Sequence, residues 1–138
     1  MTFFMKNKIY ISLVLLAAAA CRPISSEYTY IVDNQCNDTI QVNIIYWDDS
    51  TEYNMLVLPN NSIVLKHLNS ADYFNETFFY PTYLIKSFEI SKNGRNSNIN
   101  YLSEYNADAT YWECTVKWIR FLSIHGVEYR VKILDEHF

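Results

Sequence analysis

Length, composition and charge restrict the class of this protein. The chain has 138 residues and a net charge of −4 without any basic run, which argues against nucleic acids and anionic lipid surfaces as partners. It contains 12 Tyr and 8 Phe but only 2 Gly, so a glycine-rich phosphate-binding loop is excluded. Aromatic and β-branched side chains suit a pleated, half-buried surface, so this composition favours β structure.

The first 20 residues predict an export signal. Lys6 and Lys8 are followed by an apolar run from Ile9 to Ala20, and Cys21 comes directly after four alanines. A basic start, an apolar centre and a small-residue exit are typical of a secretory signal. The run is shorter than the roughly 20 residues that a membrane-spanning helix needs, and no later segment is longer. Residues 1–20 are therefore predicted to be a signal peptide.

The sequence before Cys21 is compatible with two processing routes, and both cleave the bond between Ala20 and Cys21. An ordinary signal peptidase would cleave after Ala20 and release a secreted protein. The stretch also resembles a bacterial lipobox, although Ala18 stands where that motif usually has Leu. The resemblance implies a lipoprotein with diacylglycerol and an acyl chain such as palmitate on Cys21, which anchors stably. Arg22 in place of Asp then implies the outer membrane, with the periplasmic or surface face left open. Residues 21–26 would form the tether.

The chain beyond the tether shows alternation and turn signals. A first strand is expected at Glu27–Val32, followed by turn formers at 33–38. Residues 39–47 alternate apolar and polar side chains, which predicts a strand with one buried face. After a turn at 48–51, residues 53–58 and 62–68 are expected to pair as a hairpin.

The second half is expected to contribute the remaining strands. Residues 69–83 are less regular and could hold a helical turn, and 84–92 resembles a strand. Asn93-Gly94 predicts a type I′ turn with Asn98–Tyr101 as the returning strand, and 102–110 is expected to be a loop. Residues 111–124 and 127–134 would flank a turn at His125-Gly126. The pattern predicts an all-β fold: one immunoglobulin-like, two-sheet antiparallel sandwich of six to eight strands over residues 27–138.

Three cysteines are an odd number for an exported protein. If Cys21 carries lipid, Cys36 and Cys114 remain as one candidate disulfide, with two separate buried thiols as the alternative. Immunoglobulin domains pair two such cysteines across a tryptophan. Here, however, Cys36 precedes the strand that leads to Trp47, so we expect the likeness to be architectural only.

The signal, the opening YTYIVDN strand, the LPNNS turn and the closing VEYRVKIL strand together resemble small uncharacterised cell-envelope lipoproteins of Bacteroidota. The resemblance covers nearly the whole chain through loose motifs. It implies a compact β-sandwich and no established activity.

Catalytic and metal-binding patterns are missing from the sequence. No histidine stands at a metal-ligand spacing from another ligand, and there is no G-x-S-x-G or P-loop motif. We therefore expect no enzyme activity, no metal and no cofactor. The acidic residues Asp48, Asp49 and Glu52 could offer oxygen ligands to calcium, but a solvated acidic turn is preferred because an EF-hand pattern is lacking.

Aromatic residues are the candidate binding residues. The segment 72–84 is rich in them, and Trp112 and Trp118 extend the set, which comprises Tyr73, Phe74, Phe78, Phe79, Tyr80, Tyr83, Trp112 and Trp118. Such rings can stack on sugars or anchor a partner protein. The alternative is a loop that packs its own rings onto the sandwich. Thr39 and Ser50 stand in short motifs that resemble Bacteroidota O-glycosylation acceptors.

Three functional hypotheses follow. The first is a non-catalytic outer-membrane lipoprotein that binds a protein or glycan through loops at one end of the sandwich. The second is an envelope inhibitor or immunity-type lipoprotein that blocks a toxin or enzyme, favoured if exposed aromatics flanked by acids lie at one edge. The third is a small hydrolase, which would need a pocket with convergent acids and bases.

Overall fold

The fold is an all-β sandwich, as the sequence predicts. The structure is a computed structural model that describes residues 25–70, 80–103, 111–120 and 124–138. Within these residues eight strands form two sheets of four strands each. The signal peptide, Cys21 and most of the tether lie outside the described residues, so those assignments stay predictions.

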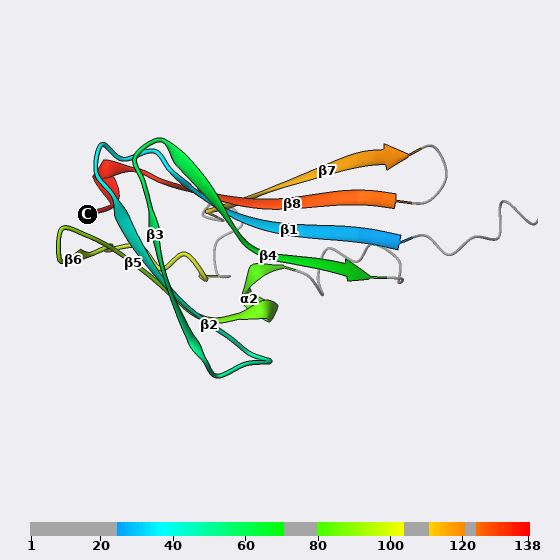
Figure 1. The fold of residues 1–138 in the computed structure, drawn as a ribbon, viewed down its shortest axis with the longest axis horizontal. Coiled ribbons are helices and arrows are strands. Elements are labelled where there is room, and N and C mark those ends of the chain that lie inside the picture. The colour runs from blue at the N-terminus through cyan, green and yellow to red at the C-terminus, as the bar shows by residue number, and fades with distance from the viewer. Residues whose placement is uncertain (1–24, 71–79, 104–110, 121–123) are drawn as a thin grey trace, which may run out of the picture.

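Each sheet combines strands from distant parts of the chain (Figure 1). Sheet A has the order β4-β1-β8-β7, with β4 at Asn61–Ser70, β1 at Ser25–Asn34, β8 at Ile124–Ile133 and β7 at Trp112–Arg120. Sheet B has the order β3-β2-β5-β6, with β3 at Glu52–Val57, β2 at Ile40–Tyr46, β5 at Ile85–Lys92 and β6 at Arg95–Asn96. A short helix, α2 at Pro81–Leu84, precedes β5, and a 3-10 turn, η1 at Asp135–His137, follows β8.

Alternating side chains produce the core between the sheets. Ile40, Val42 and Ile44 on β2 are fully buried, whereas Gln41 between them is exposed. On sheet A the rings of Tyr30 and Tyr129 stack with their centroids 5.4 Å apart. Successive strand residues point to opposite faces, so each apolar set lies on the face that meets the other sheet.

β1 lies in the middle of sheet A and pairs with β8 in parallel, whereas the other described pairings are antiparallel. The sequence analysis predicts an antiparallel sandwich, and this one parallel pairing departs from that prediction. β1 and β8 come from the two ends of the domain, so no hairpin dictates their relative direction. The first and last strands of the domain thus lie side by side in one sheet.

The predicted hairpin between residues 53–58 and 62–68 is wrong. β3 pairs with β2 in sheet B, while β4 pairs with β1 in sheet A. The connecting turn places Asn60 at φ 55°, and the Asn61 N–H donates to the Leu58 carbonyl at 3.2 Å. A turn signal shows where the chain reverses, but it does not show which sheet the next strand joins.

Two other turn predictions have mixed outcomes. Asn93 and Gly94 both have positive φ, 51° and 75°, as a type I′ turn requires. The returning strand is Arg95–Asn96 rather than Asn98–Tyr101. The turn predicted at His125-Gly126 is wrong, because both residues lie inside β8.

The predicted disulfide is absent. Cys36 is buried after β1, with its Sγ 3.5 Å from the Ile133 carbonyl oxygen, whereas Cys114 is exposed on β7 opposite Tyr129. Tyr129 and Ile133 are four residues apart on β8, or about 13 Å at the rise of a strand. This separation exceeds the Cα spacing of about 7 Å that a disulfide can bridge.

Candidate functional site

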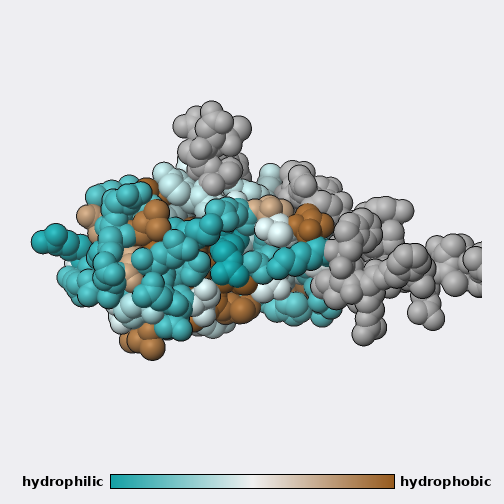
Figure 2. Space-filling model, turned by 90° about the horizontal axis from the view of Figure 1, so that it is seen from above, coloured by the Kyte–Doolittle hydropathy of each residue, from teal (hydrophilic) through white to brown (hydrophobic). Residues whose placement is uncertain are grey.

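Exposed aromatic rings gather at one end of sheet B. Trp47 follows β2, Tyr53 lies at the start of β3, and Tyr83 belongs to α2; they are 62%, 41% and 56% exposed. The face seen in Figure 2 is largely hydrophilic, with hydrophobic side chains in separate patches. Tyrosine and tryptophan are enriched at protein interfaces, because each combines a large apolar ring with a polar group. We call residues 46–53 together with Tyr83 the aromatic-acidic end.

The backbone holds Trp47 in place. Its N–H donates to the Leu84 carbonyl at 3.0 Å, and its indole Nε1 donates to the Thr82 carbonyl at 3.2 Å. The Lys86 ammonium lies 5.8 Å from the centre of the indole ring. Trp47 is thus anchored to α2 while most of its surface stays in solvent, so binding would cost little side-chain entropy.

The local sequence explains where α2 begins. Pro81 occupies the first turn, where its missing N–H costs nothing, and Tyr80 caps it in an extended conformation. The Tyr83 N–H donates to the Tyr80 carbonyl at 3.0 Å. This one turn buries Pro81 and leaves Tyr83 exposed, directly after Thr82, whose carbonyl accepts the Trp47 indole N–H.

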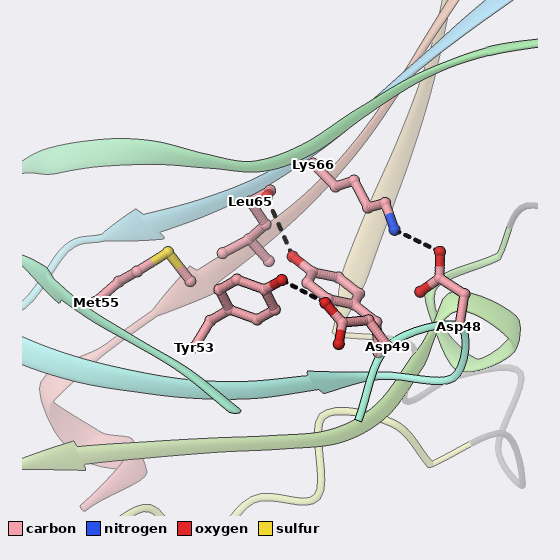
Figure 3. A pocket seen from close by; sticks show the side chains of 7 residues that line it. Asp48, Asp49, Tyr53, Met55, Leu65 and Lys66 are labelled. Atoms are coloured by element: carbon pink, nitrogen blue, oxygen red, sulfur yellow. Dashed lines mark hydrogen bonds and ion pairs between the residues drawn. The ribbon is translucent and has the colours of Figure 1, made fainter. Parts of the chain in front are cut away.

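A pocket of about 310 Å³ opens beside Tyr53 (Figure 3). It lies between the β2–β3 turn and β4, and its lining consists of Tyr46, Asp48, Asp49, Tyr53, Met55, Leu65 and Lys66. The rings of Tyr46 and Tyr53 meet edge to face at 5.7 Å. The Tyr46 hydroxyl donates to the Leu65 carbonyl at 3.1 Å, which connects the two sheets across the pocket.

The polar groups of the pocket are paired with one another. The Lys66 Nζ lies 2.9 Å from Asp48 Oδ2 and 4.5 Å from the centre of the Tyr46 ring. The Tyr53 hydroxyl donates to Asp49 Oδ2 at 2.5 Å, and the Thr51 N–H donates to Asp49 Oδ1 at 2.9 Å. The β2–β3 turn is therefore held by contacts within the turn and by side chains from β3 and β4.

These contacts determine the charge state of the pocket. The hydrogen bond from Tyr53 lowers the pKa of Asp49 from 3.8 to about 2. The same bond raises the pKa of Tyr53. Burial raises the pKa of Tyr46 to about 12. Asp49 is consequently ionised, and both phenols are neutral, at every physiological pH.

The sequence-predicted aromatics have different environments. Tyr83 is exposed at the aromatic-acidic end, whereas Tyr80 is half-buried with its ring 5.9 Å from that of Tyr129. Trp112 is 2% exposed, and its Nε1 donates to the Tyr101 carbonyl at 2.9 Å. Trp112 is therefore a core residue and is removed from the candidate binding residues. The other predicted positions lie outside the described residues or side chains: Tyr73, Phe74, Phe78, Phe79 and Trp118.

Sequence reasoning missed three members of the site, Tyr46, Trp47 and Tyr53. A signal was present, because YWDDSTEY places aromatic residues on both sides of a predicted acidic turn. A ring directly before such a turn and another directly after it lie at neighbouring ends of two paired strands. The two O-glycosylation candidates are described as well: Ser50 is exposed inside this turn, and Thr39 is half-buried before β2.

Metal-binding and catalytic constellations are not found in the described parts of the chain. No group of three or more His, Cys, Asp or Glu side chains there could hold a metal ion. Asp48 and Asp49 instead contact Lys66 and Tyr53. The pocket lining contains no histidine, cysteine or serine.

Two of the three histidines have described side chains. His67 is exposed, with its Nδ1 3.0 Å from Thr29 Oγ1, and His137 is buried with its Nδ1 3.0 Å from the Tyr101 hydroxyl. The side chain of His125 is not among those that the structure describes.

Comparison with known proteins yields no relative. The chain matches no family model, and no curated protein or solved structure is significantly similar to it. Its likeness to Bacteroidota lipoproteins therefore stays a prediction from motifs. None of the described helices is long and apolar enough to cross a membrane.

Proposed function

We propose that this protein is a non-catalytic lipoprotein of the cell envelope, anchored to the outer membrane by lipid on Cys21, that binds a partner protein through its aromatic-acidic end. The observation that carries the proposal is the exposure of Trp47, Tyr53 and Tyr83 around a turn whose backbone and side chains are already hydrogen-bonded. Tryptophan and tyrosine contribute most to protein interfaces when they are held in position before binding.

Charge favours a basic protein over a glycan. The pocket contains two aspartates and one lysine, and the whole chain has a net charge of −4. An acidic surface attracts a basic partner over long distances and speeds their association. A glycan is the second candidate, because exposed rings also stack on sugars and carboxylates accept hydrogen bonds from hydroxyl groups.

An inhibitor or immunity-type role is a special case of the same proposal. Exposed aromatic residues flanked by acids at one edge of the sandwich are the feature that favours it, and Trp47 and Tyr53 flank Asp48 and Asp49. In this role the aromatic-acidic end would cover the active surface of a basic toxin or enzyme. A small hydrolase is the weakest of the three hypotheses, because the pocket offers no general base beyond its paired carboxylates.

Site-specific photo-crosslinking in the envelope of the native host tests the binding site. A benzophenone side chain would replace Trp47, Tyr83 or, as the control, Leu58. Leu58 is 61% exposed, close to the 62% of Trp47, but it follows the opposite end of β3 from Tyr53. We expect one common protein adduct from positions 47 and 83 and little or none from position 58.

The outcomes separate the candidate functions. Equal adducts from all three positions, or none from 47 and 83, would contradict the proposal. An adduct whose added mass is removed by glycosidases would support the glycan instead. If the captured protein is a toxin or enzyme that the purified lipoprotein inhibits, the inhibitor role is supported.

The anchor has its own test. The intact mass of the membrane-extracted protein should exceed that of the chain starting at Cys21 by a diacylglycerol and one acyl chain. The excess should disappear in a Cys21→Ser variant expressed in the same host. A mass equal to the unmodified chain would mean simple secretion.

A further inference from the structure

The pocket contains two pairs of a tyrosine ring and a carboxylate, but only one lysine lines it (Figure 3). Tyr46 and Asp48 form the first pair. Here the Lys66 ammonium lies 4.5 Å from the ring centre and 2.9 Å from the carboxylate oxygen. The chain itself thus shows that this pocket accommodates an ammonium group between a ring and a carboxylate.

Tyr53 and Asp49 form the second pair. Asp49 accepts hydrogen bonds from the Tyr53 hydroxyl and the Thr51 N–H, one on each oxygen. Among the residues that the structure describes, no Lys, Arg or His nitrogen lies within ion-pair distance of Asp49. A carboxylate has about four lone-pair sites, so each oxygen of Asp49 can accept a further donor.

We propose that the Tyr53–Asp49 pair binds the ammonium or guanidinium group of a lysine or arginine side chain presented by the partner protein. This inference rests on the proposed function and names the chemistry that the aromatic-acidic end recognises. A cation over a tyrosine face is attracted by the ring quadrupole, and the adjacent carboxylate adds a charge-assisted hydrogen bond.

The dimensions and charge of the pocket suit one side chain. Its volume of about 310 Å³ is at the lower limit for small-molecule sites, so it fits a single residue better than a complete ligand. Met55 and Leu65 supply apolar lining for the methylene stem of such a side chain. Two carboxylates against one ammonium disfavour an anionic guest.

Binding of a lysine model compound tests the proposal directly. N-acetyl-lysine methylamide and its norleucine analogue differ in the terminal ammonium and would be titrated into the detergent-solubilised full chain, with backbone amide shifts as the signal. We expect the lysine compound to bind at least about fivefold more tightly, with the largest shifts at residues 49–53. Raising the salt concentration should reduce the preference.

Two variants with the same change in charge provide the control. Asp49→Asn removes the carboxylate of the second pair and should abolish the preference for lysine. Glu89→Gln removes an exposed charge from β5 of the same sheet, but Glu89 lies outside the aromatic-acidic end and does not line the pocket, so the preference should remain. Equal binding of lysine and norleucine, or equal loss in both variants, would overturn the proposal.

The failure of this inference is distinguishable from failure of the proposed function. Crosslinks at Trp47 and Tyr83 without a lysine preference would mean that the partner binds through the exposed rings alone. A lysine preference without crosslinks would leave a cation site but remove the evidence for a protein partner at this end.

Discussion

At the scale of single residues, Asn34 connects the two sheets. It is fully buried at the end of β1, and its Nδ2 donates to the carbonyls of Asp38 at 2.9 Å and Val57 at 2.8 Å. Its Oδ1 accepts the Cys36 N–H at 2.9 Å. A carboxamide has two N–H donors and one carbonyl acceptor. The Asn34 side chain therefore satisfies backbone groups at both ends of the turn after β1, the Cys36 N–H and the Asp38 carbonyl.

Asn34→Ala should destabilise the fold by about 2–4 kcal/mol, because it leaves buried backbone groups without hydrogen bonds. Asn54→Ala, on an exposed position of β3, should change the free energy of unfolding by no more than about 0.5 kcal/mol. Urea unfolding of both variants measures the difference. Similar losses in the two would show that the Asn34 contacts contribute little.

His137 should make stability depend on pH. It is buried beside Tyr101, its Nδ1 accepts the Leu134 N–H at 3.3 Å, and burial lowers its pKa below the usual 6.5. The unfolded chain therefore takes up a proton more readily than the folded one. The contribution of neutral His137 is fully present above pH 6.5 and is lost as the pH falls through the lowered, folded-state pKa.

Urea unfolding at pH 7.5 and pH 5 tests this dependence against a His137→Gln variant. The wild type should lose more stability between the two pH values than the variant, because the variant lacks the imidazole that takes up a proton. The carboxylates are the same in the two proteins, so their contribution cancels in the comparison. An identical loss in both proteins would exclude His137 as the source.

At the scale of elements, β-turns illustrate what local chemistry can specify. Asn93-Gly94 needs two positive φ angles, which asparagine and glycine adopt at low cost, and the turn forms where the sequence places it. Asn60 also has positive φ, yet its turn leads the chain from sheet B to sheet A. Turn residues specify a reversal, and the apolar faces of the following strands decide the pairing.

Gly94→Ala should cost about 1–2 kcal/mol, because alanine is strained at a φ of 75° even though nothing lies within 4 Å of the added Cβ. Gly126→Ala is the matched control. Gly126 lies in β8 beside a surface hollow and is not among the residues with positive φ. It should be neutral or stabilising. The thermal midpoints of the two variants measure the contrast, and equal decreases would contradict the turn geometry.

At the scale of the whole molecule, sheet A depends on the first and last strands of the domain. β1 is paired on one side with β4 and on the other with β8, so neither sheet A nor its buried face is complete without residues 25–34 and 124–133. The outer face of this sheet carries ion pairs such as Lys132–Glu113 at 2.8 Å and Arg130–Glu128 at 2.9 Å. Exposed pairs of this kind add little stability, and the core supplies most of it.

Reduction should leave stability unchanged, because no disulfide joins Cys36 and Cys114. A bridge closing so long a loop would contribute on the order of 4–5 kcal/mol, and its loss would lower the melting temperature by many degrees. Thermal unfolding of the Cys21→Ser variant with and without dithiothreitol makes the comparison. A clear decrease with reductant would show that the two thiols are oxidised in solution.

Much of the fold could be predicted from local patterns, and the candidate site only in part. The alternation of residues 40–44 predicts the burial of Ile40, Val42 and Ile44, and the Asn93-Gly94 pair predicts its turn. Trp112 is as apolar and as large as Trp47, yet one is in the core and the other is exposed. Composition does not distinguish them, because burial depends on which strand of the opposite sheet covers each ring.

The sequence by itself determined the all-β class, the buried faces of β2 and β8 and the acidic turn after Trp47, because each depends on neighbouring residues in one segment. Only the tertiary structure decided that β3 and β4 join different sheets, that β1 runs parallel to β8, and that Lys66 faces the turn that contains Asp48. These features depend on contacts between distant segments. Their free energy arises from the joint burial of two sheets, which no local pattern encodes.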